Sequence, residues 1–124
     1  MPFKTRHITK LITACRSGYY HQIKGKMHDS TGFDILGLAC EVYRISSGKG
    51  KWVKDSSSKE GEMTFGKAKT GLETLLPQYV VDWYGFDDPC PSIMYKGKDT
   101  LFIDLNDSFK LSFAKIADVL EKIL

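Results

Sequence analysis

The C-terminal segment, residues 111–124, constrains the fold more than any other part of the sequence. Ser112 is a residue type that caps helix N-termini, and Leu111 and Ile116 stand at the spacing of a hydrophobic staple. Apolar side chains then recur at helical spacing, which predicts an inward-facing stripe of Phe113, Ile116, Ala117, Leu120 and Leu124. Such a helix depends on packing its stripe against a core, so the fold must be built around this element.

Three further segments have helical patterns. Residues 5–17 carry one apolar stripe and end before Gly18. Residues 34–45 begin at Asp34, a good cap, and a helix of about two turns begins at Pro77 and ends before Gly85. The side chains expected to face inward are Ile8, Leu11, Ile12 and Cys15 in the first helix, Ile35, Leu38, Ala39 and Val42 in the second, and Val80, Val81, Trp83 and Tyr84 in the third.

Gly37 lies inside the second predicted helix. Glycine there costs about 1 kcal/mol relative to alanine, which is tolerable if the missing side chain lets a neighbouring segment approach closely. We therefore expect this helix to be the central one.

The remaining segments are extended or loop-like. Residues 19–23 are aromatic and favour a short strand or an extended segment, residues 52–54 and 63–65 favour a hairpin, and residues 93–95 favour a strand that turns at 96–99. Residues 46–71 are rich in Lys, Gly and Ser and predict a mobile loop. The sequence thus predicts one α+β domain over residues 1–124, mainly helical, with about four helices and a small antiparallel sheet or hairpin.

Composition limits the class of protein. A chain of 124 residues has room for one core and none for a second domain. No segment approaches the roughly 20 apolar residues of a membrane span, and the cysteines Cys15, Cys40 and Cys90 are odd in number and widely spaced. We expect a soluble protein, without a membrane partner, whose thiols are reduced as in a cytosol.

Charge is unevenly distributed along the chain. The net charge of +3 combines a first half of +6 with a second half of −3, and residues 4–26 contain no Asp or Glu. This basic segment either attracts an anion or pairs with the acidic second half.

The motifs that would indicate catalysis or metal binding are incomplete. Residues 61–68 match G-x-x-x-x-G-K, but Ala68 replaces the hydroxyl residue that a phosphate-binding loop needs for magnesium. Residues 104–108 lack the glycine and glutamate of a calcium loop, and the adjacent Asp87 and Asp88 precede a proline as in a solvated turn. The histidines His7, His21 and His28 lack metal-site spacing. We assign no catalytic residue, metal ligand or cofactor, and we favour a protein that is not an enzyme.

The best candidate binding surface follows the first helix. It combines cationic donors with aromatic faces, which suit phosphates, bases or acidic protein patches. Its residues are Arg16, Tyr19, Tyr20, His21, Gln22, Lys24 and Lys26. The alternative is that these aromatic side chains belong to the core.

Five motifs in order resemble a family of small proteins encoded in phage and prophage genomes. They are Arg16-Ser17-Gly18-x-Tyr20-x-Gln22, Leu36-Gly37-Leu38-x-Cys40, Leu76-Pro77-x-x-Val80-x-x-Trp83-x-Gly85, Leu105-Asn106-Asp107 and Ser112-Phe113-x-x-Ile116-Ala117-Asp118. The family usually has Cys-Cys-Leu-Gly where this chain has Ile35-Leu36-Gly37 without the cysteine pair. The resemblance implies a viral origin and an accessory role in the cytoplasm of an infected bacterial cell.

Two functions remain open from the sequence. The first is a binding protein that captures or inhibits a host component, for example in host defence; its partner would be a host protein or a small anionic signalling molecule, with nucleic acid less favoured. The second is a small enzyme acting on a nucleotide-like substrate. We favour the first, because a small viral protein can act by occupancy alone.

Overall fold

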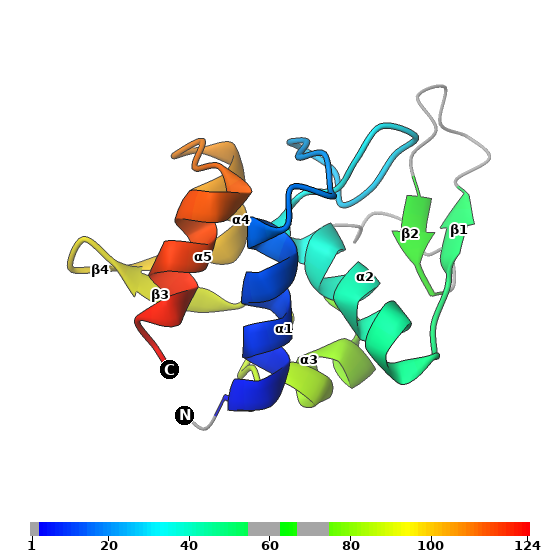
Figure 1. Cartoon of the computed structure of the whole chain (residues 1–124), viewed down its shortest axis with the longest axis horizontal. Helices are drawn as coiled ribbons and strands as arrows, with labels where there is room; N and C mark the ends of the chain where they lie inside the picture. Colours follow the sequence, from blue (N-terminus) through cyan, green and yellow to red (C-terminus); the bar gives the residue numbers. More distant parts are fainter. Residues whose placement is uncertain (1–2, 55–62, 67–74) are drawn as a thin grey trace.

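The computed structural model of the chain describes residues 3–54, 63–66 and 75–124. It is an α+β fold in which helices surround one hydrophobic core and two small hairpins lie at opposite sides (Figure 1). The elements in order are α1 (Thr5–Arg16), α2 (Ile35–Ser47), β1 (Trp52–Lys54), β2 (Met63–Phe65), α3 (Gln78–Tyr84), β3 (Ser92–Tyr95), β4 (Lys98–Leu101), α4 (Phe102–Asp107) and α5 (Phe113–Glu121). The predicted fold class is therefore confirmed.

The first and last long helices pack side by side. The predicted stripe of α1 is buried, with Ile8 and Leu11 completely inaccessible, and α5 packs along α1 through Ile116 and Leu120, which are also inaccessible. Ser112 caps α5 as predicted, because its hydroxyl oxygen accepts a hydrogen bond from the Lys115 amide at 3.2 Å. The strongest sequence signal thus marks a main packing contact of the core.

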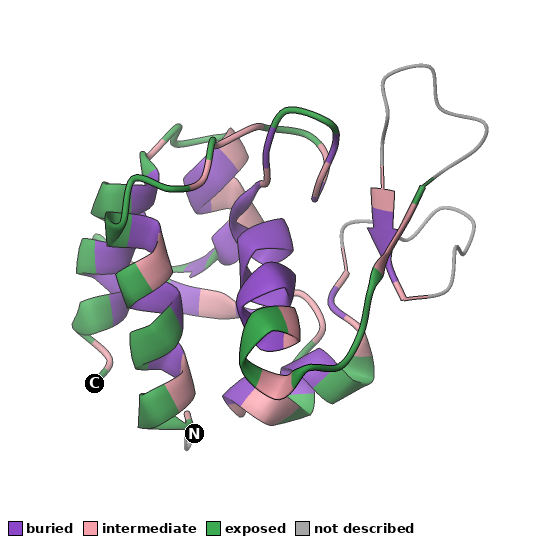
Figure 2. Cartoon of the chain, turned by 45° about the vertical axis from the view of Figure 1, so that its right-hand side comes forward, coloured by how far each residue is buried: buried purple, intermediate pink, exposed green. Residues whose placement is uncertain are grey.

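Helix α2 is the central element, as the sequence predicts. All its residues from Ile35 to Tyr43 are buried (Figure 2). Asp34 caps it by accepting a hydrogen bond from the Gly37 amide at 2.7 Å. A Cβ atom on Gly37 would lie 1.8 Å from the carbonyl oxygen of Met27, so glycine permits the preceding loop to lie directly on the helix.

Helix α3 and the hairpins complete the core. The Tyr84 hydroxyl donates a hydrogen bond to the Ala39 carbonyl at 2.6 Å, which fixes α3 to α2, and the His7 ring stacks on Trp83 at 3.7 Å. Each hairpin is a two-stranded antiparallel sheet. In the first, Trp52 pairs with Phe65 and Lys54 with Met63; in the second, Ser92 pairs with Leu101 and Tyr95 with Lys98.

One local expectation is wrong, and the structure specifies two further segments. Residues 19–23 form no strand, because pairing there is limited to one bridge, between Gln22 and Phe33, before Gly25 turns the chain with φ +80°. Residues 102–107 form helix α4, for which the sequence shows no helical pattern, because Phe102 and Leu105 are both buried against the core. Leu124 is 51% exposed, because α5 ends at Glu121 and the chain leaves the helix axis.

The predicted loop over residues 46–71 is described only in part. Residues 46 and 47 complete α2, and strands β1 and β2 occupy residues 52–54 and 63–65, as the sequence predicts for the hairpin. Residues 55–62 and 67–71 lie outside the described residues.

Candidate functional site

An open groove lies between α1 and α2, which run in opposite directions side by side (Figure 1). Its volume is about 340 Å³. Two threonines of α1 and the serine that follows its last residue, spaced one turn apart, form one wall, and residues of α2 form the other. The lining residues are Thr9, Lys10, Thr13, Ala14, Ser17, Tyr19, Tyr20, Val42, Ile45 and Ser46.

Large apolar side chains lie exposed at the edges of this groove. Tyr19 is 88% exposed and Ile45 is 58% exposed. Across the groove, the Lys10 ammonium donates a hydrogen bond to the Ser46 hydroxyl at 3.3 Å. Exposed apolar side chains around a hollow are typical of contact surfaces, whereas isolated ones are ordinary.

The hydroxyl groups of the α1 wall are already engaged within the helix. Thr9, Thr13 and Ser17 donate to the backbone carbonyls of Thr5, Thr9 and Ala14 at 2.8, 2.9 and 2.7 Å. This wall therefore offers an incoming molecule carbon surface and oxygen acceptors, while the charged donor of the described lining is Lys10.

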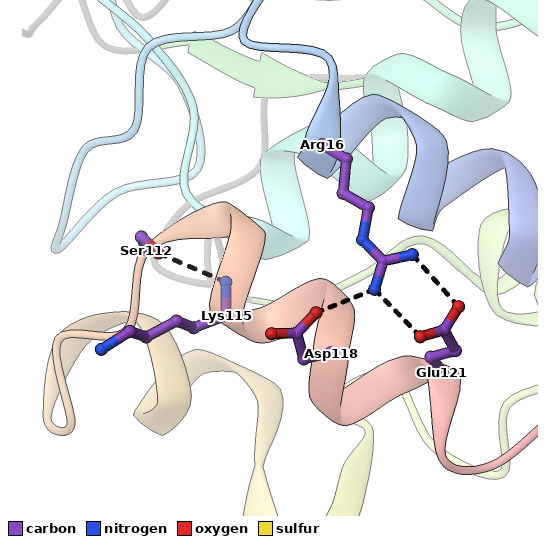
Figure 3. Close-up of polar contacts among 5 residues, drawn as sticks. All are labelled: Arg16, Ser112, Lys115, Asp118 and Glu121. Carbon is purple, nitrogen blue, oxygen red and sulfur yellow. Dashed lines mark hydrogen bonds and ion pairs between the residues drawn. The ribbon is translucent and has the colours of Figure 1, made fainter.

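Arg16 points away from the groove to the acidic side of α5. Its guanidinium donates to Asp118 at 2.8 Å and to both carboxylate oxygens of Glu121 at 3.0 and 3.1 Å (Figure 3). Hydrogen bonds from Arg16 lower the pKa of Glu121, and Glu121 and Asp118 together raise the pKa of Arg16. For this residue the structure shows internal pairing of the basic and acidic halves.

Gln22 is a structural anchor. Its amide nitrogen donates to Asn106 Oδ1 and to the Leu111 carbonyl, both at 2.8 Å, and its oxygen accepts from the Phe113 amide at 2.9 Å. Asn106 is completely buried; its Oδ1 also accepts from the Ile35 amide, and its Nδ2 donates to the Ile23 carbonyl. This network joins the loop after α1 to the starts of α2 and α5.

The other predicted site residues are spread over the same loop. Tyr20 is partly buried, with its ring edge-on to Phe33 at 5.8 Å, and Lys26 lies 3.8 Å from Asp29. His21 and Lys24 are exposed. Of the seven predicted residues, the structure brings Tyr19 and Tyr20 to the groove lining, while Gln22 holds the loop and Arg16 holds α5.

Three groups whose pKa values are raised, Cys15, Cys40 and Asp34, are enclosed in the core. Burial raises the pKa of Cys15 to about 12 and that of the inaccessible Cys40 well above its ordinary value. Asp34 is also inaccessible; burial raises its pKa to about 7, with a smaller contribution from the nearby Asp107. These groups sit where a substrate has no access, and all three cysteines are free thiols.

The tertiary structure gives no support to the incomplete phosphate-loop and metal-binding motifs within the described residues. Residues 61, 62, 67 and 68 of the phosphate-loop match lie outside the described residues, and its centre is strand β2. Among the described residues, no group of three or more His, Cys, Asp or Glu side chains could hold a metal ion. Asp104 and Asp107 belong to α4, where Asp107 accepts a hydrogen bond from the Gly25 amide at 3.1 Å. No helix in the described part of the chain could span a membrane.

The α2 wall of the groove is missing from the sequence-based site. The sequence pattern places Val42 in the core and Ile45 at the end of the helix. In the sequence, Ile45 is an apolar residue next to a buried stripe. This pattern does not show that α1 leaves the Ile45 side chain uncovered. Which side chains of two neighbouring helices stay exposed side by side depends on how the helices pack.

The fold and groove define a small α+β protein with an open surface between two helices. A comparison with protein families matches residues 3–124 to the family described as Domain of unknown function (DUF8296), and the chain belongs to that family. Searches of curated proteins and of solved structures gave no match.

Proposed function

We propose that this chain is a non-catalytic binding protein and that the groove between α1 and α2 is its binding surface. The observation that carries the proposal is the hollow of about 340 Å³ with Tyr19 and Ile45 exposed at its edges. When a partner covers them, a few large side chains, Tyr among the commonest, supply most of the free energy of protein association.

The burial of Cys15, Cys40 and Asp34 supports binding rather than turnover. Cysteine acts as a nucleophile in its thiolate form, and the raised pKa values of Cys15 and Cys40 oppose that form. Asp34 has a pKa suited to proton transfer, yet it is inaccessible and caps α2.

The resemblance to phage and prophage proteins directs the search for the captured component. We propose that the component belongs to a bacterial host, that binding takes place in the host cytoplasm, and that capture inhibits it. The competing function is an enzyme acting on a nucleotide-like substrate.

The test compares capture by the intact chain with capture by a groove variant. The full chain is immobilised, bacterial lysate is passed over it, and retained proteins are quantified by mass spectrometry. We expect Ile45→Asp to reduce retention of the true partner about tenfold, because a carboxylate in an apolar contact must be desolvated. Binding of the purified partner is then measured by calorimetry.

Met94→Asp is the matched control. Met94 is 64% exposed on β3, so the substitution makes the same chemical change away from the groove. If the Ile45→Asp variant retains the partner as well as the wild-type chain does, the groove is not the binding surface. Turnover of a nucleotide by the purified chain would favour the enzyme.

A further inference from the structure

The groove has the dimensions of a peptide contact rather than of an enclosed ligand site. Its α1 wall runs from Thr9 to Ser17, which is about 12 Å along a helix axis. That length matches two turns of a helix or a few residues of extended chain. Tyr19 and Ile45 are largely exposed, whereas sites for small molecules usually surround most of the ligand.

Along both helices, basic side chains flank the described residues that line the groove. Arg6 lies one turn before Lys10 on α1, and Lys49 follows the end of α2; all three side chains are exposed. Helix α1 contains no acidic residue. The carboxylate of Glu41 on α2 is bound by Arg44 at 2.7 and 2.8 Å and by the Trp52 indole at 2.9 Å, and its side chain is 11% exposed.

Lys10 is placed to receive a carboxylate. Its hydrogen bond to the neutral Ser46 hydroxyl is long, at 3.3 Å, and exposed to solvent. A carboxylate is a stronger acceptor for an ammonium group than a hydroxyl is, because the bond is then charge-assisted at both ends. An acidic group of a partner can therefore replace Ser46.

We infer that the groove binds an amphipathic segment of a partner protein in which one or two large apolar side chains are flanked by Asp or Glu. This inference rests on the proposed function and specifies the partner's chemistry. The apolar side chains fill the space between Ala14, Val42 and Ile45, and a flanking carboxylate pairs with Lys10. Complementary charge also accelerates association with such a segment and disfavours basic ones.

A random peptide library displayed against the immobilised full chain tests the inference. We expect selected peptides to combine Leu, Phe or Trp with Asp or Glu, and their affinity, measured by fluorescence anisotropy, to fall as salt is raised. Lys10→Glu should weaken the selected peptide about tenfold, and a peptide with its acidic residues changed to Lys should bind this variant better than it binds the wild-type chain.

Lys115→Glu is the matched control, since Lys115 is an exposed helical lysine on α5. It should change affinity by less than about twofold. Selected peptides without carboxylates, or binding insensitive to Lys10→Glu, would overturn the inference, and if Ile45→Asp still abolished that binding the proposed function would stand.

Peptide binding unchanged by Ile45→Asp would overturn both ideas, because the groove would then not be the contact. Failure to select any peptide, together with release of a small anion when the purified chain is denatured, would also overturn the inference and assign the groove to a small molecule.

Discussion

At the scale of single residues, several residues of the sequence motifs have structural roles: some pair backbone groups at helix ends, and one allows two segments to pack closely. Asn106 and Gln22 satisfy backbone groups that the start of α2 and the start of α5 leave unpaired. Gly37 removes a side chain where the loop at Met27 contacts the helix. Asp34 caps α2, but its second oxygen is buried and has no hydrogen-bond partner among the residues that the structure describes. A buried carboxylate in that position is costly, which links stability to pH.

The stability of the fold should fall as pH rises through the range in which Asp34 ionises. Burial raises the pKa of Asp34 from 3.8 to about 7, so the folded state holds its proton more tightly than the unfolded chain. The stabilisation is fully present below about pH 4 and is lost as pH rises towards 7. Asp34→Asn keeps a good cap and removes the charge.

Urea midpoints at pH 5 and pH 8 measure this effect. The wild-type chain should lose on the order of 2–4 kcal/mol more stability than Asp34→Asn between these two values. Because every other titrating group is common to both proteins, the difference between them isolates Asp34. Parallel pH dependence in the two proteins would contradict the assignment.

At the scale of elements, helix α5 is stabilised mainly by its contact with α1. Its cap and stripe are readable from sequence, but a helix of nine residues is marginal in isolation. The packing that makes it stable joins residues about a hundred positions apart, as the ion pairs of Arg16 with Asp118 and Glu121 show (Figure 3).

Truncating the buried stripe of α5 should destabilise the fold by cavity creation. Ile116→Ala or Leu120→Ala should each cost on the order of 2–5 kcal/mol, because both side chains are completely buried. Leu124→Ala removes a side chain that is 51% exposed and should cost much less. Denaturant midpoints measure the three variants, and equal midpoints for Ile116→Ala and Leu124→Ala would mean that α5 is peripheral.

At the scale of the whole molecule, the basic and acidic halves of the chain meet at the α1–α5 contact. The sequence allows two interpretations of the basic segment: it attracts an anion, or it pairs with the acidic second half. The two interpretations apply to different residues. Arg16 pairs with the acidic half, whereas Lys10 lies at the groove on the opposite side of α1. Part of the charge asymmetry therefore belongs to the fold, and part is available to a partner.

Charge reversal at Arg16 should lower the thermal midpoint, while reversal at Lys24 should leave it nearly unchanged. Arg16→Glu places three carboxylates together, and adding Asp118→Lys and Glu121→Lys should recover part of the loss. We expect a decrease of a few degrees that shrinks as salt is added. Thermal melts of Arg16→Glu and Lys24→Glu that coincide would show that the ion pairs contribute nothing.

The sequence by itself determined the features that depend on neighbours along the chain. The caps at Asp34 and Ser112, the stripe of α1, that of α5 as far as Leu120, and the stop at Gly85, which has a φ of +81°, follow from local backbone chemistry and helical spacing. These features gave the fold class, since one-sided helices must share a core.

The tertiary structure decided what depends on residues far apart in sequence. From the sequence, Gln22 is a candidate ligand-binding residue. In the folded chain its side chain is instead hydrogen-bonded to Asn106 and Phe113, which lie far away in the sequence. Residues 102–107 are helical because Phe102 and Leu105 are buried in the core. The groove exists because α1 and α2 pack without covering Ile45, and no local pattern records which apolar side chain a distant helix will leave exposed.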